Sequence, residues 1–312
     1  MKTNEIYQTV TDTIIKLLEN HLDDWQRPWI SFGKDNDFAR NATTGKYYRG
    51  VNQFLLSFML MNGDYFKNSW LTFNQVKAKG GNIRKGEKAA PIVFFKTAYL
   101  DKENKYYPKE RVQEMPKGQI DALGLKSIPV LRLFRVFNVA QTEGLEDVYY
   151  EVTPQEPLQD FEKDERAEKL IYSTGADIEV TESDRAYYNP VTDKIRLPLR
   201  EQFRGATQPF YGTALHELAH WTGADKRLNR DMSGSFGDDS YSKEELVAEL
   251  TAAFCCAHLG FSKTITNNAA YLKHWLGIMK ADNKAIVKAS YQAQKAADYI
   301  IGGGSLPSYD QD

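Results

Sequence analysis

Apolar residues in the first half of the chain recur with two different periods. From residue 5 to residue 21 they return every three or four positions, which predicts an amphipathic helix that buries Ile6, Val10, Ile14, Leu17 and Leu18. Residues 52–61 and 72–79 also fit helices, and Thr72 is a candidate N-cap for the second. Residues 92–100 and 130–139 are rich in β-branched and aromatic side chains, which favours strands. We therefore expect an α+β fold around a small antiparallel sheet.

The second half begins with strand patterns and continues with helical ones. A helix is predicted over residues 165–174 and a strand over residues 177–181. Residues 186–189 and 194–197 flank the turn-type sequence PVTD, so they are expected to form a hairpin. Helices are predicted over residues 211–222, 243–259, 267–280 and 284–300. Strands followed by helices are typical of a second α+β domain.

Charge divides the chain near the same point as the patterns. Residues 151–169 are acidic and polar with two early prolines, which is typical of a linker, and we place domains at residues 1–150 and 151–312. Residues 1–140 contain 22 Lys+Arg and 14 Asp+Glu, whereas the whole chain contains 40 and 42. The first part therefore carries a net charge of +8 and the rest −10. This asymmetry indicates two roles, one of which involves a polyanion.

Composition argues against a membrane or secreted protein. No apolar run approaches the roughly 20 residues that cross a bilayer, and the N-terminus lacks the apolar core of a secretory signal. The two cysteines, Cys255 and Cys256, are adjacent and do not make a disulfide framework. We therefore expect a cytoplasmic protein with no membrane partner.

The sequence HELAH at residues 216–220 has the spacing of a zinc-metallopeptidase motif. His216 and His220 are four positions apart, so a helix places both imidazoles on one face, where they can share a metal ion. Glu217 follows the first histidine and can take a proton from a zinc-activated water molecule. The alternative is a pair of surface histidines on an ordinary helix. The apolar neighbours Leu215 and Trp221 count against it, because they indicate a buried helix.

A catalytic zinc site usually has a third protein ligand, and the sequence SKEELVAELTAAF offers three glutamates. Glu245 and Glu249 share a helix face. One could bind Zn²⁺ while the other orients a ligand histidine. We favour Glu249 as the ligand, because an apolar segment follows it, and Glu245 is the alternative. Glu244 fits a solvated acidic face best.

The basic half combines cations with aromatic residues. Residues 34–135 contain 19 Lys+Arg and 9 Asp+Glu, with aromatic side chains interleaved. Cations follow a phosphate backbone and aromatic rings stack on unpaired bases, so the combination favours single-stranded DNA. The alternative is core aromatics beside a solvated basic face. The candidate DNA contacts are Lys46, Tyr48, Arg49, Asn52, Trp70, Lys77, Arg84, Lys85 and Lys88.

Several segments resemble ArdC-type antirestriction proteins. WxxPW at 25–29, TGKYYRGVN at 44–52, WLTFNQ at 70–75 and GGNIRKGEKA at 80–89 are similar to the N-terminal domain of that family. HELAHWTG at 216–223, Arg227-Leu228 and EELVAEL at 244–250 are similar to its metallopeptidase domain, and YYNPVTDKIRLP at 187–198 to its substrate-side hairpin. Residues 100–124 lie outside these motifs.

The resemblance implies an N-terminal domain that binds single-stranded DNA and a C-terminal zincin-like metallopeptidase domain. It also implies a role in protecting the incoming DNA of conjugative plasmids and related mobile elements from host restriction. The expected partners are single-stranded DNA and an unidentified protein substrate, with the host restriction machinery as one candidate. Two other hypotheses stay open: a DNA-binding protector whose metal site is structural or inactive, and a stand-alone metallopeptidase that does not bind DNA.

Overall fold

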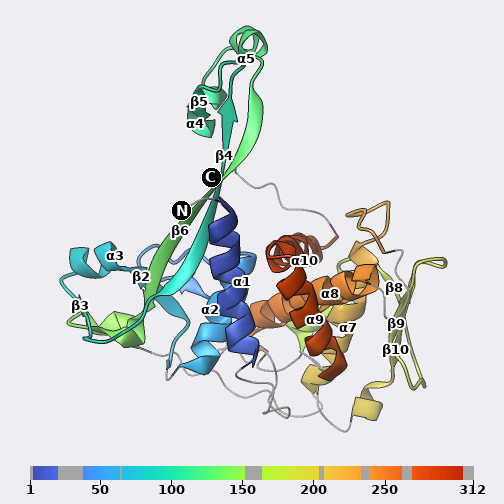
Figure 1. The fold of residues 1–312 in the computed structure, drawn as a ribbon. Helices are drawn as coiled ribbons and strands as arrows, with labels where there is room; N and C mark the ends of the chain where they lie inside the picture. Colours follow the sequence, from blue (N-terminus) through green and yellow to red (C-terminus); the bar gives the residue numbers. More distant parts are fainter. Residues whose placement is uncertain are drawn as a thin grey trace.

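The computed structural model describes residues 3–19, 38–63, 65–151, 164–203, 207–232, 239–261 and 269–304. The WxxPW segment and most of the expected linker lie outside these ranges. Within the described part of the chain, no helix is long and apolar enough to span a membrane. Figure 1 shows a mixed α+β molecule, as expected, with its sheets and helices gathered into one body from which a long arm projects.

The N-terminal half is built on a five-stranded sheet in the order β1-β2-β6-β4-β5. Its strands are β1 (Arg40–Asn41), β2 (Ser69–Thr72), β4 (Ala90–Leu100), β5 (Tyr106–Pro108) and β6 (Lys126–Asn138). All neighbouring strands are antiparallel except β1 and β2, which are parallel. A separate two-stranded ribbon joins β3 (Asn82–Ile83) to β7 (Thr142–Glu143). The expected antiparallel pairing of two long strands is confirmed as β4 and β6.

Three helices accompany this sheet, and the sequence predicted all of them: α1 (Thr3–Glu19), α2 (Val51–Asn62) and α3 (Phe73–Ala78). The apolar face predicted for α1 is its buried face. Thr72 caps α3 as expected, because its side chain accepts a hydrogen bond from the Gln75 backbone while Gln75 reaches back to the cap.

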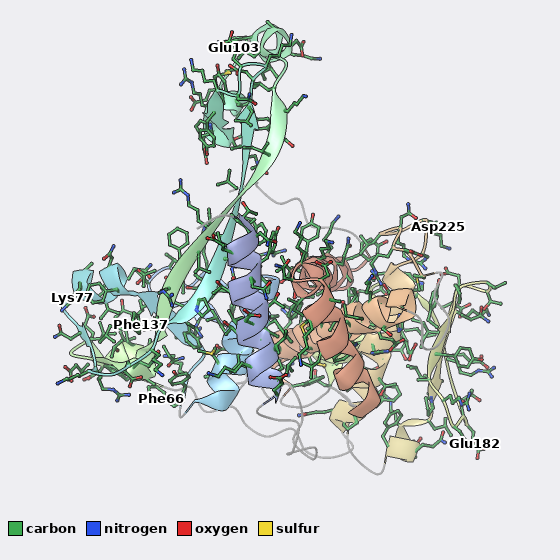
Figure 2. The ribbon with its side chains drawn as sticks, in the orientation of Figure 1. Phe66, Lys77, Glu103, Phe137, Glu182 and Asp225 are labelled. Carbon is green, nitrogen blue, oxygen red and sulfur yellow. The ribbon has the colours of Figure 1, made fainter. Side chains whose placement is uncertain are left out.

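Residues 100–124 form the tip of the arm. They contain β5, α4 (Lys109–Gln113) and α5 (Lys117–Leu123), which continue the β4–β6 ribbon away from the body (Figure 1). Glu103 marks the far end of the arm in Figure 2. The segment that falls outside the recognised motifs is therefore an outward extension of the sheet.

The C-terminal half places a small sheet beside a group of helices. The sheet order is β8-β10-β9, with β8 (Asp177–Thr181) parallel to β10 (Lys194–Pro198) and β9 (Tyr187–Asn189) antiparallel to it. The predicted hairpin is confirmed as β9 and β10. The helices are α6 (Glu165–Tyr172), α7 (Thr207–Thr222), α8 (Asp239–Leu259), α9 (Ala269–Ala281) and α10 (Ala285–Ile301). Short 3₁₀ turns occur at Val139–Gln141, Asp147–Tyr149 and Arg200–Phe203.

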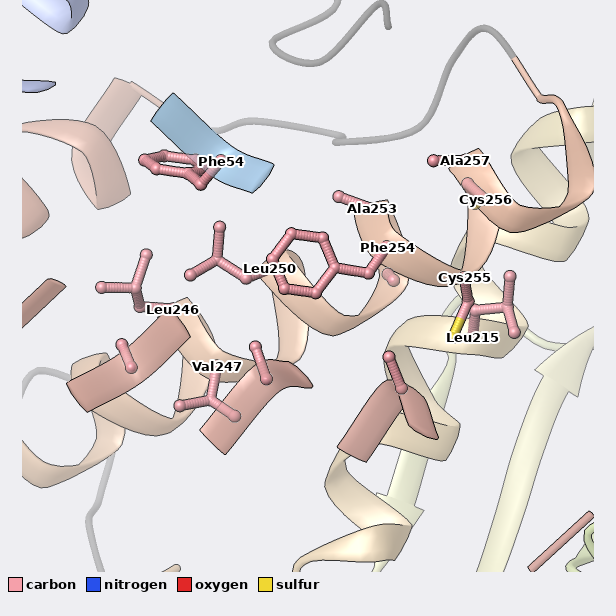
Figure 3. Close-up of a cluster of buried hydrophobic side chains, with 14 of the residues drawn as sticks. Phe54, Leu215, Leu246, Val247, Leu250, Ala253, Phe254, Cys255, Cys256 and Ala257 are labelled. Carbon is pink, nitrogen blue, oxygen red and sulfur yellow. The ribbon is translucent and has the colours of Figure 1, made fainter. Parts of the chain in front are cut away.

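One hydrophobic core connects the two halves. Buried residues of α1 and α2 belong to the same cluster as buried residues of α7, α8 and α10. Figure 3 shows Phe54 of α2 beside Leu250 and Phe254 of α8. Polar contacts reinforce the junction, since the Thr11 hydroxyl donates to the Asn283 carbonyl at 2.8 Å and Arg49 forms an ion pair with Asp298. The two domains are therefore packed together through apolar side chains.

Replacing Phe254 with alanine is expected to destabilise both halves together. The side chain is 1% exposed, and truncating a buried phenylalanine typically costs about 3–5 kcal/mol of unfolding free energy. Hydrogen exchange under mild urea measures the effect on each helix separately. Protection should fall by a similar amount in α1 and α8, whereas loss confined to α8 would contradict a shared cooperative core. Exposed Tyr291→Ala serves as the control.

Candidate metal centre

The two motif histidines meet on one face of α7, as their spacing predicts. Leu215, Leu218 and Ala219 of the same helix are fully buried. The Nε2 atoms of His216 and His220 lie 3.2 Å apart, and their rings are nearly perpendicular. Both side chains are mostly buried. The two nitrogens therefore face one point in space.

Helix α8 crosses α7 and brings its glutamates to this point. The Glu245 carboxylate approaches both histidines, with Oε1 3.4 Å from Nε2 of His220 and Oε2 3.6 Å from Nε2 of His216. Among the described residues, these three form the one group of metal-ligating side chains that offers an atom each within 4.8 Å of the others. Glu249 instead lies 3.6 Å from Nδ1 of His216, on the far side of the ring. The geometry thus favours Glu245 over Glu249, the reverse of the preference drawn from the sequence.

The remaining ring nitrogens also face carboxylates. Nδ1 of His220 lies 3.3 Å from Oε1 of Glu244, and Nδ1 of His216 faces Glu249. Ligand histidines usually pair their second ring nitrogen with a carboxylate or carbonyl, which fixes the tautomer and leaves Nε2 for the metal. Both imidazoles have this arrangement.

Arg230 holds Glu244 in place from behind. Its Nε donates to Glu244 Oε2 at 2.9 Å and its Nη2 to Oε1 at 2.6 Å. The same guanidinium also donates to the Thr222 hydroxyl and the Ala219 carbonyl, and the side chain is only 5% exposed. Glu244 is itself 7% exposed, so the expectation that it forms a solvated face is wrong.

The residues present fit a divalent metal ion. Two atoms about 2.1 Å from a tetrahedral zinc lie roughly 3.4 Å apart, which agrees with the separations between the two Nε2 atoms and the Glu245 oxygens. Charge leads to the same conclusion. Glu217, Glu244 and Glu245 are buried close to Glu249, and the Arg230 guanidinium pairs with Glu244; burial together with Glu245 raises the pKa of Glu249 well above its ordinary value. A bound cation would balance this excess of negative charge.

Glu217 lies beside this group without joining it. It is 7% exposed, and burial, partly opposed by His220, raises the pKa of its carboxyl to about 7. The backbone N–H of Tyr188 on β9 donates a hydrogen bond to the carboxylate. Burial also lowers the pKa of His216, to about 4, whereas hydrogen bonds with Glu244 and Glu245 outweigh burial and raise the pKa of His220 to about 10. Glu217 is thus a buried carboxylate that does not share the point where the two histidines and Glu245 meet.

A second arginine attaches the β9–β10 hairpin to α7. Arg227 lies 4.0 Å over the Trp221 ring and donates to Asp193 and to the Tyr188 hydroxyl. The Tyr188 hydroxyl itself donates to Asp193 at 2.8 Å, and burial together with this bond raises the pKa of Tyr188 to about 12. These contacts position the strand whose backbone meets Glu217.

The hairpin and the loop after α7 enclose a cleft of about 790 Å³. Tyr188 and Arg230 line this cleft and also touch the surroundings of the two histidines. Its other walls come from the hairpin turn and the loop: Pro190, Val191, Asp193, Gly223, Ala224, Asp225, Lys226, Asn229, Asp231 and Met232. Tyr188 and Arg230 therefore connect the cleft to the candidate metal centre.

The DNA-contact candidates differ in exposure and in their contacts. Lys46, Lys85 and Lys88 are exposed, Lys77 lies over the exposed Phe73 ring, and Arg84 pairs with Glu87. Arg49 pairs with Asp298, and Tyr48 is half-buried against the core. Trp70 is fully buried, and the Asn52 side chain bonds both backbone groups of Val93. Trp70 and Asn52 therefore belong to the packing of the fold, and we leave them out of the proposed contacts.

Sequence reasoning missed Arg230 and the role of Glu244. A lone arginine ten residues beyond the motif gives no spacing signal, because its place depends on how the loop returns to α7. Gly223 is a partial signal: a Cβ there would lie 2.5 Å from the Met232 sulfur and 3.0 Å from Arg230 Nη2. Gly223, which directly follows α7, therefore permits this close approach.

Comparisons with known proteins agree with the two-part architecture. A family model described as the N-terminal domain of anti-restriction factor ArdC matches residues 4–137, and one described as a zincin-like metallopeptidase matches residues 165–292. Crystal structures of the antirestriction ArdC protein from plasmid R388 superpose with TM-scores of 0.75 for the metal-free form and 0.72 for the Mn(II)-bound form. The metal-free form is 33% identical in sequence, and the match covers 96% of this chain and 97% of that one.

Curated relatives match over nearly the whole chain as well. An uncharacterized protein of Sinorhizobium fredii, y4eC, is 35% identical over 298 residues, which is 95% of this chain and 91% of the relative. A DNA primase TraC of Escherichia coli is 33% identical over 302 residues, but the chain spans only 27% of that protein's length. The chain belongs to the ArdC family of antirestriction proteins, with an ArdC N-terminal domain followed by a zincin-like metallopeptidase domain.

Proposed function

We propose that this protein is a metal-dependent peptidase that also binds single-stranded DNA and protects incoming mobile-element DNA from host restriction. The observation that carries the peptidase part is the convergence of His216 Nε2, His220 Nε2 and the Glu245 carboxylate beside buried Glu217. We propose these three as the metal ligands, with Glu249 and Glu244 orienting the two histidines. Zn²⁺ is the proposed metal, and the Mn(II)-bound relative makes Mn²⁺ the first ion to compare with it.

The residues around the site suit peptide hydrolysis. A zinc ion held there would act as a Lewis acid and lower the pKa of a coordinated water molecule toward about 7. Glu217, kept in place by the Tyr188 N–H, would accept a proton from the water molecule and pass it to the leaving amine. Glu244, held by Arg230, would accept the Nδ1–H of His220, which leaves Nε2 facing the metal position.

A protein substrate fits the surface next to Glu217. Strand β9 forms one edge of its sheet, and the cleft between the hairpin and the loop after α7 opens beside it. An extended peptide can add to an exposed strand edge through its backbone, with side chains entering neighbouring pockets. Tyr211 is fully buried and bonded to Glu168, so it is not free to donate to a developing oxyanion. Tyr188 and Arg227 are engaged with Asp193, and Tyr187 pairs with Arg196 on the face of the sheet opposite buried Ile195.

The test is cleavage by the whole protein. Zinc-loaded protein is incubated with unfolded proteins and with lysate of a restriction-proficient host, with and without single-stranded DNA, and fragments are identified by mass spectrometry. Fragments that disappear after chelation and return with zinc would support the peptidase. No fragments from metal-loaded protein, together with tight DNA binding, would instead support a DNA-binding protector with a structural metal site.

Replacing Arg230 with glutamine is expected to weaken metal binding without touching a ligand. Glu244 would lose its bidentate partner and hold His220 less firmly, and losses of such supporting contacts typically reduce metal affinity by about 10–100-fold. Competition with a chromogenic chelator measures the affinity. Arg230→Gln leaves the Glu244 carboxylate buried without its partner. The double variant Arg230→Gln/Glu244→Gln removes that charge, so it should recover folding stability but not metal affinity. Arg227→Gln is the control, since Arg227 contacts the hairpin and none of the three glutamates. An unchanged affinity in Arg230→Gln would contradict the proposed relay.

A further inference from the structure

The ribbon formed by β4 and β6 exposes three phenylalanines on its way out of the body. Phe94, Phe95 and Phe134 are 48%, 47% and 42% exposed, although each lies within a regular strand. Figure 1 shows the two strands rising past α1 toward the tip of the arm. Single exposed apolar residues are ordinary, but several large rings gathered on one ribbon indicate an interaction surface.

Strand register places two of these rings on one face. Phe94 is opposite Arg132, and Ile92 is opposite Phe134, so Phe94, Arg132 and Phe134 project to the same side. The Phe94 and Phe134 ring centroids are 6.1 Å apart and the rings are nearly perpendicular. Phe95 follows Phe94 directly, so it projects to the opposite side. We call Phe94, Arg132 and Phe134 the aromatic face. It consists of two rings and one exposed arginine.

All the charged residues of the ribbon are basic. The two strands contain Lys96, Lys126, Arg132 and Arg135 but no aspartate or glutamate. Arg132 and Arg135 are exposed, and no described carboxylate forms an ion pair with either. An apolar surface that served a protein partner alone would not need an excess of one charge. The pattern fits an anionic ligand that also offers flat apolar groups.

We propose that the aromatic face binds unpaired bases of single-stranded DNA, with Phe94 and Phe134 stacking on bases and Arg132 contacting phosphate. This rests on the DNA-binding part of the proposed function and gives it a location. Rings that project from a sheet face are a common platform for stacking unpaired bases, and the bases of a duplex would not be available to them. Trp70, which the sequence suggested for stacking on bases, is fully buried. The rings proposed here for stacking were not selected from the sequence.

The experiment compares the double variant Phe94→Ala/Phe134→Ala with Phe95→Ala in the full-length protein. Phe95 has the same side chain, strand and degree of exposure, but lies on the opposite side of the ribbon. Fluorescence anisotropy with a labelled oligo-dT at fixed salt measures the affinity. Loss of stacking should weaken binding by about 5–100-fold per base, whereas Phe95→Ala should bind like the wild type. Phe94→Trp should keep the affinity, and matching circular dichroism spectra and melting temperatures show that the variants are folded.

An abasic oligonucleotide separates stacking from charge. It keeps the phosphates, so the double variant and the wild type should bind it equally. Arg132→Ala should weaken the binding of both the oligo-dT and the abasic oligonucleotide. The assignment to this face would be overturned if the double variant and Phe95→Ala lost equal affinity for oligo-dT. It would also be overturned if the double variant lost as much affinity for the abasic strand as for oligo-dT. Wild-type protein that binds no oligonucleotide would refute DNA binding itself. Wild-type-like binding by the double variant would refute only the location.

Discussion

Glu217→Gln is expected to abolish peptide hydrolysis while the metal stays bound. Glutamine has nearly the same size and can still accept the hydrogen bond from the Tyr188 N–H, so the local packing should survive. It cannot accept a proton from the attacking water molecule, and removal of a general base typically slows catalysis by about 10²–10⁴-fold. Because Glu217 is outside the group of ligand atoms, its loss should not release the metal.

Two measurements on the same preparation separate these effects. Rates of fragment formation with a substrate found in the cleavage assay give the catalytic loss, and metal content by mass spectrometry gives the occupancy. Glu182→Gln makes the same chemical change at an exposed position and should behave as the wild type. If Glu217→Gln cleaved the substrate at the wild-type rate, Glu217 would not be the general base. Loss of the metal together with activity would make it a ligand.

Glu245→Gln is expected to reduce metal affinity far more than Glu249→Gln. Glu245 approaches Nε2 of both histidines, whereas Glu249 approaches only Nδ1 of His216. Removal of an orienting carboxylate typically costs about 10–100-fold in metal affinity, and removal of a ligand should cost more. Both variants change one carboxylate on the same face of the same helix, so each is a matched control for the other.

Chelator competition with Zn²⁺ and with Mn²⁺ gives both affinities under one set of conditions. His216→Ala provides the reference for the loss of a ligand. Comparable losses in the two glutamate variants would mean that both carboxylates bind the metal. A larger loss in Glu249→Gln would restore the assignment that the sequence favoured.

Sequence patterns anticipated the elements of this fold better than the contacts between them. The helical spacing of His216 and His220 is a local property of one helix, and their nitrogens meet as expected. The choice between Glu245 and Glu249 is different, because both share one face of α8. It depends on the angle and register at which α8 crosses α7. No local pattern carries that information.

The same distinction explains the basic half. Trp70 and Phe94 are both aromatic residues in strands, and nothing local distinguishes the fully buried ring from the half-exposed one. Their difference comes from the long reach of β4 and β6 beyond the residues that cover the sheet. The 25 residues from 100 to 124, which matched no motif, explain that reach, because they fold as the far end of the same ribbon.

The shared core restricts how this protein can be rearranged by recombination. A genetic exchange between residues 138 and 164 would join two halves whose apolar surfaces had not been selected together, although Phe54 and Phe254 belong to one buried cluster. Most chimeras of that kind should fold poorly. The similarity to TraC extends over 95% of this chain and through both halves, although TraC is a much longer protein. Both domains are therefore expected to be inherited as one unit.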